Sequence, residues 1–329
     1  MKALIYEGPE ELTLRDAPDP VPEVGQQLIK VGAVGICGSD MHAYLGHDER
    51  RPAPLILGHE AAGVIVGGAR AGERVTLNPL VTCGICKACI SGHDNLCADR
   101  MIISMPPREG AFAQYVTMRD ENLVTVPDHI SLEKAALTEP IACGWHAVRL
   151  AKERLGPGSY TALVIGGGAI GLGAALSLVA QGVHDITLVE PNALRREYLN
   201  RQCRQNAVSN DHLKPEMMFD IVIDGVGYAG TRTTASAHAR PGGVIAHIGL
   251  GENTGGLDIR RMTLQEITFI GTYTYTMQDF RDTAQAIFDG RLGPLDWTQT
   301  RALADGAAAF ADIRAGRTPA PKIILHPNP

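Results

Sequence analysis

The chain has 329 residues, of which 45% are hydrophobic and 20% charged, and its formal net charge is −6. This length exceeds what one simple core fills, so two domains are expected. The net negative charge and the lack of an extended run of lysine or arginine argue against partners such as nucleic acid or an anionic membrane. The N-terminal residues show no secretory signal, so a cytoplasmic location is expected.

Residues 1 to about 140 contain short β-like segments that glycine and proline clusters interrupt. The clearest are residues 27–36, 61–68 and 111–118. Short runs of this kind are typical of antiparallel sheets, so the first region is predicted to form a barrel-like domain.

Two motifs in this region carry groups that bind metals. Cys37 lies in GICGSDMH, and His59 and Glu60 follow in LGHEAAG. Taken singly, each has an ordinary interpretation as a core thiol, a capped histidine or a surface carboxylate. Together they supply the thiolate, imidazole and carboxylate ligands of an open zinc site.

Four of the seven cysteines lie in the segment CGICKACISGHDNLC with the spacing C-x2-C-x2-C-x7-C. They are Cys83, Cys86, Cys89 and Cys97. An odd cysteine total, the absence of a secretory signal and the strain of bridging C-x2-C pairs all argue against disulfides. Reduced thiols are more often metal ligands or catalytic groups, so residues 83–97 are predicted to serve one of those roles.

From about residue 160, strand-like and helix-like segments alternate. This alternation predicts a doubly wound parallel sheet of the α/β class. The expected buried strands are residues 161–167, 185–190, 219–227, 242–250 and 267–273. Beyond about residue 290 the runs shorten and end in residues 322–327, so the tail is expected to fold back onto the first domain.

The motif G-x-G-x-x-G occupies residues 166–171, directly after a strand and at the start of an apolar helix. Gly166 would form the tight turn, Gly168 would admit a pyrophosphate, and Gly171 would let helix and strand pack closely. Ala169 and Ile170 open the helix whose amides would bind the pyrophosphate. The alternatives are a glycine-rich turn without a nucleotide and, for residues 161–180, a membrane span. The strand–turn–helix context favours a dinucleotide site.

The residue Glu190 ends the next predicted strand and bears on the choice of dinucleotide. A carboxylate there hydrogen-bonds the ribose hydroxyls and repels a 2′-phosphate, which favours NAD over NADP. Arg195 and Arg196 follow and would contact adenine or ribose, or tolerate a phosphate. NAD is therefore the expected cofactor, with NADP as the less favoured alternative.

Taken together, CGSDMH, GHEAAG, the four-cysteine segment, TEP at residues 138–140 and VIGGGAIG resemble the zinc-dependent medium-chain dehydrogenases. Within that family the chain is most similar to the polyol (sorbitol-type) and threonine dehydrogenase branch. The resemblance spans nearly the whole chain. It implies a GroES-like catalytic domain of residues 1–140 and 290–329, and a Rossmann NAD-binding domain of residues 141–289.

The resemblance also implies two zinc ions per chain. The four cysteines match the family's structural zinc site, which is closed and cannot bind substrate. An iron–sulfur cluster is the rival, but the ferredoxin run continues x3-C-P, whereas here seven residues separate Cys89 from Cys97 and no proline follows.

The catalytic zinc would be held by Cys37, His59 and a carboxylate, either Glu139 of TEP or Glu60. Asp40 matches the group that orients the ligand histidine. The zinc would act as a Lewis acid on the alcohol oxygen, and hydride would pass to the nicotinamide. Ser39 and His42 match the family's proton relay; taken alone, they would be a turn residue and a surface histidine.

The substrate expected from the resemblance is a small secondary alcohol, with a polyol favoured over threonine-type or simple alcohols. Tyr44, residues 103–112 and residues 271–276 would approach the substrate pocket. A homodimer or homotetramer is expected, with residues 267–273 as a pairing edge. The alternative of another class is a non-catalytic protein that binds zinc and a nucleotide.

Overall fold

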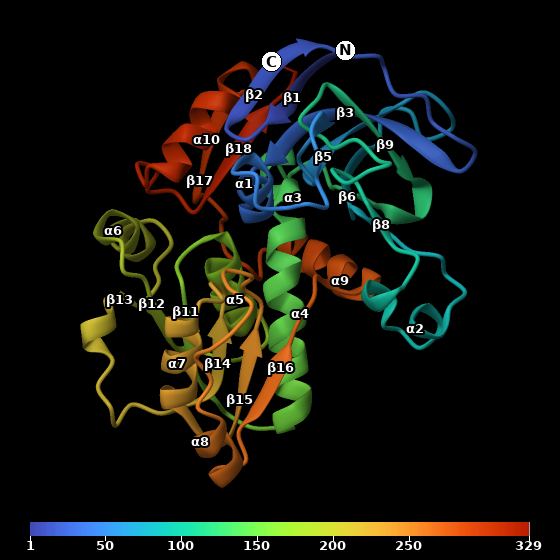
Figure 1. Cartoon of the computed structure of the whole chain (residues 1–329). Coiled ribbons are helices and arrows are strands. Elements are labelled where there is room, and N and C mark those ends of the chain that lie inside the picture. The colour runs from blue at the N-terminus through green and yellow to red at the C-terminus, as the bar shows by residue number, and fades with distance from the viewer. Residues whose placement is uncertain (329) are drawn as a thin grey trace. The chain divides into compact units, whose positions relative to one another are not determined.

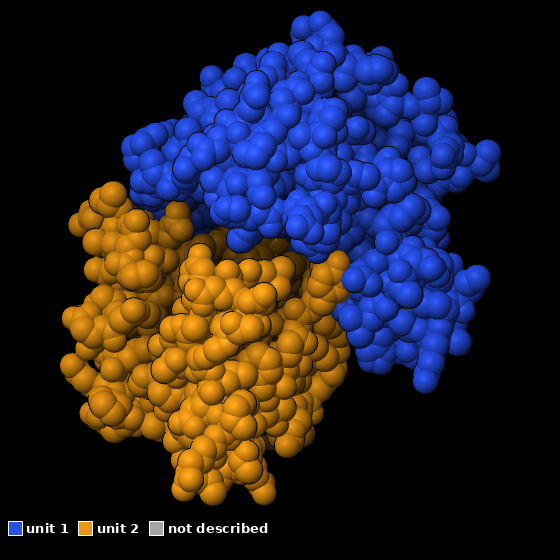
Figure 2. Space-filling model, viewed as in Figure 1, with its two compact units in different colours: residues 1–139, 276–289, 298–329 blue, residues 140–275, 290–297 orange. Residues whose placement is uncertain are grey.

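The structure is a computed structural model that describes residues 1–328, and it divides into two compact units (Figure 2). Unit 1 comprises Met1–Glu139, Thr276–Asp289 and residues 298–328, and unit 2 comprises Pro140–Tyr275 and Gly290–Trp297. The segment Thr276–Asp289, expected in the Rossmann domain, therefore groups with unit 1. Gly290–Trp297, expected in the catalytic domain, groups with unit 2.

Unit 1 is built mainly from short strands, and Figure 1 labels many of them together with the helices. Its strands are β1 (Lys2–Gly8), β2 (Glu11–Asp16), β3 (Gln26–Gly35), β4 (Leu55–Ile56), β5 (Glu60–Val66), β6 (Arg74–Leu77), β7 (Leu80–Val81), β8 (Met101–Ile102), β9 (Tyr115–Arg119), β10 (Leu123–Thr125), β17 (Thr298–Ala302) and β18 (Lys322–His326). Its helices are α1 (Gly38–Tyr44), α2 (Lys87–Ile90), α3 (Leu132–Ala136), α9 (Met277–Phe288) and α10 (Gly306–Arg314), with short 3-10 turns at Asp94–Leu96, Asp120–Asn122 and Leu303–Asp305.

The largest sheet of unit 1 runs in the order β10-β6-β5-β3-β18-β17, and β9 also pairs with β3. Its neighbours are antiparallel except β17 and β18, which run parallel. The C-terminal tail returns to unit 1 because β18 pairs with β3, with Ile324 opposite Gly35. This pairing brings the first residue of β18 close to the segments that carry the metal-binding motifs.

Unit 2 contains a six-stranded parallel sheet in the order β13-β12-β11-β14-β15-β16. This order is that of the Rossmann fold, as the strand–helix alternation predicts. The strands are β11 (Thr161–Ile165), β12 (Asp185–Val189), β13 (Ala207–Val208), β14 (Phe219–Asp224), β15 (Ala239–His247) and β16 (Thr268–Gly271). The helices are α4 (Thr138–Leu155, whose first two residues belong to unit 1), α5 (Ala169–Ala180), α6 (Ala193–Arg201), α7 (Ala229–His238) and α8 (Ile259–Leu264), with a 3-10 turn at Asn210–His212.

The apolar runs explain this core. Four of the five residues of β11 and four consecutive residues of β14 are buried, as expected for central strands covered on both faces. The apolar segment 161–180 forms β11 and then α5. Within residues 1–328, no helix is both long enough and apolar enough to cross a membrane.

Candidate active site

The four predicted cysteines come together in unit 1, around α2 and the turn that follows it. Their Sγ atoms all lie within 4.8 Å of one another. The Cys86–Cys89, Cys83–Cys97 and Cys83–Cys89 separations are 3.5, 3.6 and 3.9 Å. A tetrahedron with metal–sulfur bonds of about 2.3 Å has edges of about 3.8 Å. The segment therefore has the geometry of a closed four-thiolate zinc site.

One of these thiols is already shifted toward the form that binds metal. The backbone amide of Cys89 hydrogen-bonds to Cys86, and this contact, with those of the neighbouring thiols, lowers the pKa of Cys86 to about 7. Burial and the hydrogen bond to Cys86 raise the pKa of Cys89 to about 12, so the pair favours a single thiolate, on Cys86. A thiolate at neutral pH is the metal-binding form of cysteine.

A second polar cluster in unit 1 gathers around His59. Cys37 is the N-cap residue of α1, Asp40 lies in the first turn of that helix, and His59 immediately precedes β5. Asp40 Oδ2 accepts a hydrogen bond from the Cys37 amide at 3.0 Å, which satisfies a free donor at the helix start. Asp40 is 0% exposed and His59 is 5% exposed, so both act in a largely water-free environment.

The contacts of His59 divide between its two ring nitrogens. Nδ1 lies 3.4 Å from Asp40 Oδ1 and 3.2 Å from Ser104 Oγ, whereas Nε2 lies 3.4 Å from Ser39 Oγ. Burial lowers the pKa of His59, but Asp40 and Cys37 outweigh it and hold that pKa well above its ordinary value. Because Nδ1 is taken up by a carboxylate and a hydroxyl, Nε2 is the nitrogen left for a metal.

Glu60, the first residue of β5, is fully buried beside Lys322, the first residue of β18. Glu60 Oε1 lies 2.5 Å from Lys322 Nζ, which also donates to the Ile36 carbonyl at 2.8 Å. Burial lowers the pKa of Lys322, but the charges of Glu60, Cys37 and Glu139 raise it above its ordinary value. The three predicted ligand residues Glu60, Cys37 and Glu139 therefore all lie near the Lys322 ammonium group.

The donor chemistry of this cluster fits a zinc ion. Glu60 Oε2 is buried, and among residues 1–328 no hydrogen-bond partner is found for it. A buried carboxylate oxygen without a partner is an atom that a cation would satisfy. In the described chain, only the four cysteines have ligand atoms that all lie within 4.8 Å of one another. The ligand atoms of Cys37, His59, Glu60 and Glu139 are therefore more widely spaced than those of the four cysteines. Glu139, in the first turn of α4, is 6% exposed.

The predicted relay residues Ser39 and His42 both lie on α1, three positions apart and hence on the same side of the helix. Ser39 contacts the His59 ring, and His42 is exposed to solvent. Tyr44, expected near the substrate pocket, instead belongs to the core. It is 7% exposed, and its ring centroid lies 5.2 Å from that of Phe310.

In unit 2, the glycine motif forms the turn between β11 and α5. Gly166 has φ +96°, a backbone conformation that favours glycine. A Cβ atom on Gly171 would lie 1.7 Å from the Gly166 carbonyl oxygen, so the helix approaches the turn too closely for any side chain. Gly168, the N-cap of α5, has open space at its Cβ position and no side-chain cap. The amides at the start of α5 are therefore available to an anion.

Glu190, which directly follows β12, is 6% exposed and makes contacts that the sequence did not reveal. Its Oε2 accepts a hydrogen bond from the Gly167 amide at 2.9 Å, and its Oε1 accepts one from the Asn192 amide at 2.8 Å. Glu190 therefore also holds the glycine turn in shape. Arg195 lies in the first turn of α6, where its amide donates to the N-cap residue Asn192, and Arg196 donates to the Glu190 carbonyl at 2.9 Å.

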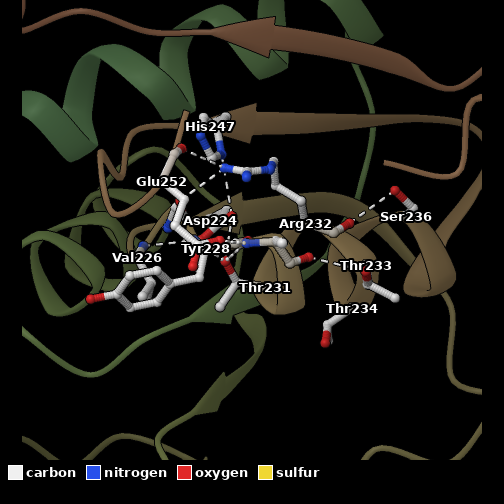
Figure 3. Close-up of polar contacts among 12 residues, drawn as sticks. Asp224, Val226, Tyr228, Thr231, Arg232, Thr233, Thr234, Ser236, His247 and Glu252 are labelled. Carbon is white, nitrogen blue, oxygen red and sulfur yellow. Dashed lines mark hydrogen bonds and ion pairs between the residues drawn. The ribbon is translucent and has the colours of Figure 1, made fainter. Parts of the chain in front are cut away.

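In unit 2, a polar cluster around Asp224 joins the loops that follow β14 and β15 (Figure 3). Asp224, at the end of β14, is 0% exposed. Its Oδ1 accepts hydrogen bonds from the amides of Val226 and Gly227 at 3.0 and 2.9 Å. Its Oδ2 accepts one from Thr231 Oγ1 at 2.9 Å and lies 3.2 Å from His247 Nδ1. These contacts fix the backbone of residues 225–227.

Arg232 links the same two loops through backbone carbonyls. It is 5% exposed and donates to the carbonyls of Gly227 and Gly255 at 2.8 and 2.6 Å, and also to that of Thr254. It donates to the carbonyl of Glu252 at 3.0 Å (Figure 3). The linked loops adjoin the glycine turn, because a Cβ atom on Gly166 would lie 2.4 Å from Val226 Cγ2. They therefore form one side of the dinucleotide turn.

The sequence did not single out three residues that the structure brings into these clusters, namely Lys322, Ser104 and Arg232. Lys322 carries a weak signal, since a lone charge opens an otherwise apolar strand. Ser104 lies within residues 103–112, which were expected near the substrate pocket, but neither it nor Arg232 carries a signal of its own. Each acts through groups that only the fold brings near.

Comparison with known proteins assigns segments of both units to known domain families. Residues 23–128 match the alcohol dehydrogenase GroES-like domain, and residues 169–289 match the zinc-binding dehydrogenase domain. Sorbitol dehydrogenase of Bacillus subtilis is 35% identical over 84% of this chain and 82% of its own length. L-galactonate-5-dehydrogenase of Escherichia coli is 30% identical over 89% of this chain and 88% of its own.

A solved structure with the same fold is that of acetophenone reductase from Geotrichum candidum in complex with NAD. It matches with a TM-score of 0.87 and 26% identity, over 99% of this chain and 96% of that one. The expected family and fold class are confirmed. The chain belongs to the zinc-binding alcohol dehydrogenase family, as an enzyme with a GroES-like unit and a Rossmann unit.

Proposed function

We propose that this protein transfers hydride between the carbinol carbon of a polyol and NAD. The observation that carries the proposal is the buried cluster around His59, whose Nε2 and neighbouring Cys37 and Glu60 form an open set of zinc donors. The substrate class rests on the relatives named as sorbitol dehydrogenase and L-galactonate-5-dehydrogenase. The NAD-bound acetophenone reductase supports the cofactor.

In this proposal, Cys37, His59 and one carboxylate, Glu60 or Glu139, would hold the catalytic zinc. A bound zinc ion supplies Lewis-acid polarisation of the alcohol oxygen. Asp40 lies beside Nδ1 of His59 and would keep the ring proton on that nitrogen once a zinc ion takes the place of the proton on Nε2.

The side chains on α1 move the proton that the alcohol loses. Ser39 Oγ would accept it while passing its own hydroxyl proton on, and His42, which is exposed, would take up the proton passed on and release one to solvent. The four-cysteine segment holds a second zinc that stabilises the surrounding loop and takes no part in the reaction.

The cofactor lies on unit 2 in this proposal. The open amides of α5, from Ala169 onward, would bind the pyrophosphate of NAD, which supplies a hydride acceptor when it is bound. Glu190 repels a 2′-phosphate, so Glu190→Ser should raise the use of NADP relative to NAD. Ratios of kcat/KM for the two cofactors measure this, and an unchanged ratio would count against the role of Glu190.

The test of the function is NADH formation by the zinc-loaded protein with NAD and a panel of hexitols, pentitols, inositols, threonine, butanediol and simple secondary alcohols. Turnover with one polyol group is expected. Cys37→Ser should abolish it. Cys203→Ser is the matched control, since Cys203 belongs to neither cysteine site and burial raises its pKa to about 12. No turnover with any member of the panel, despite NAD binding, would contradict the proposal.

The protein is further proposed to be cytoplasmic and to form a homodimer or homotetramer through β16. In the described chain this strand pairs only with β15, which leaves its other edge free. Sedimentation velocity would show an oligomer for the wild type and a monomer for Gly271→Pro, because the Gly271 amide faces away from β15 and a Cβ atom there meets open space.

A further inference from the structure

Ser104 lies in the loop after β8 and combines three unusual properties. It is 0% exposed, its φ is +67°, and its Oγ lies 3.2 Å from His59 Nδ1. A non-glycine residue in the left-handed region is strained, and such strain persists only where the surrounding structure imposes it. The serine hydroxyl thus reaches the histidine at the expense of an unfavourable backbone.

The surrounding structure that imposes this conformation includes Arg51. Arg51 Nε donates to the Ser104 carbonyl at 3.0 Å, and the side chain is only 3% exposed. Its guanidinium is fixed in turn by Asp48, whose Oδ2 lies 2.5 Å from Arg51 Nη1. A buried charged donor of this kind anchors the backbone at Ser104 strongly.

The Ser104 hydroxyl gives His59 Nδ1 a second contact in addition to the one with Asp40. Asp40 Oδ1 lies 3.4 Å from His59 Nδ1 and also accepts the Gly58 amide at 3.2 Å, so its contact with the ring is long and shared. Ser104 approaches the same nitrogen from a different segment of the chain. Two partners in different directions at Nδ1 restrict rotation of the imidazole ring.

We propose that Ser104 is a positioning residue of the catalytic zinc site, which acts by orienting His59 and is itself held by Arg51. This inference rests on the proposed assignment of His59 as a zinc ligand. Partners of this kind typically change metal affinity by about 10- to 100-fold when they are removed.

The experiment is zinc release from the two-zinc protein into excess chelator, followed with a metal-sensitive dye. The wild type should release one zinc from the open site and, more slowly, one from the four cysteines. Ser104→Ala removes the hydroxyl and should speed only the first phase, by about 10- to 100-fold. Ser104→Gly removes the hydroxyl and also relieves the backbone strain, so it should speed the first phase equally while keeping or raising the thermal midpoint.

Ser177→Ala is the matched control, because it removes another fully buried serine hydroxyl, one that bonds only the Gly173 carbonyl in α5. It should leave both phases unchanged. Wild-type release from both Ser104 variants, or a wild-type rate restored by glycine, would overturn the inference. Release of a single zinc by the wild type would instead overturn the underlying assignment of the catalytic zinc.

Discussion

The ion pair of Lys322 and Glu60 is a buried contact within the proposed zinc cluster. Both side chains are at most 3% exposed. Removing one partner of a buried pair leaves an uncompensated charge, so Lys322→Met should lower the free energy of unfolding by about 3–5 kcal/mol. Urea unfolding of the zinc-loaded proteins measures this.

Lys2→Met is a matched control for that variant. Lys2 also begins a strand and pairs with a carboxylate, Asp16, but both groups are exposed. The urea midpoint should hardly change, because exposed ion pairs contribute little. Adding Glu60→Gln to Lys322→Met should recover part of the loss. Equal midpoints for the two lysine variants would show that the buried pair is not stabilising.

Asp224 should make stability depend on pH. Burial would raise its pKa, but His247, the amides of Gly227 and Val226 and the Thr231 hydroxyl hold that pKa below its ordinary value. A lowered folded-state pKa adds stability above the unfolded value of about 3.9, and this stability is lost as pH falls through the folded value. Wild type should therefore exceed Asp224→Asn in unfolding free energy near pH 7. The gap should narrow below about pH 4, whereas a constant gap would exclude the ionised carboxylate as the cause.

At the scale of elements, Arg232 connects the loop after β14 to the loop after β15. Arg232 donates to carbonyls on the loops after β14 and β15, and these loops adjoin the glycine turn. Arg232→Met should loosen that side of the dinucleotide site. The KM for NAD should rise about 10-fold, which corresponds to about 1.4 kcal/mol, the loss of one hydrogen bond to a charged group. The KM for the alcohol should change less.

The control for this variant is Arg240→Met, which removes an arginine whose side chain is 47% exposed and which pairs with Asp220. It should leave the KM for NAD unchanged. Equal rises in the KM values for NAD and the alcohol after Arg232→Met would indicate a general loss of structure instead of a loosened cofactor loop.

The elements that the sequence predicted best are those encoded by local patterns. The central strands follow from apolar runs, and the turn at Gly166 follows from a motif six residues long. Contacts between distant residues left no such pattern. Lys322 and Glu60 are 262 positions apart, and Arg51 and Ser104 are 53 apart, so their partnership depends on strand pairing and loop placement.

The unit to which α9 belongs was also not predictable from the local sequence. The helix follows the last Rossmann strand in sequence, which suggested that it belongs with that domain. In the structure the Met277 amide donates to Asp94 Oδ2 at 3.0 Å, and α9 contacts α3, so tertiary contacts place it in unit 1. Chain order alone does not record such a contact.

At the scale of the whole molecule, the two proposed zinc sites belong to one unit and the proposed dinucleotide site belongs to the other. The donors around His59 and the four cysteines lie in unit 1, whereas the glycine turn and Glu190 lie in unit 2. Each unit has its own sheets and its own hydrophobic core. Loss of metal should therefore affect the two functions unequally.

Complete removal of zinc by a chelator should abolish turnover and make residues 83–97 more sensitive to protease, because four thiolates without metal lose the bonds that fix their loop. The affinity for NADH should stay within about 2-fold, a change of about 0.4 kcal/mol, since no residue of the glycine turn depends on the metal. Fluorescence titration with NADH before and after chelation tests this. A much larger loss of NADH affinity would mean that the fold of unit 2 depends on the zinc-bound state of unit 1.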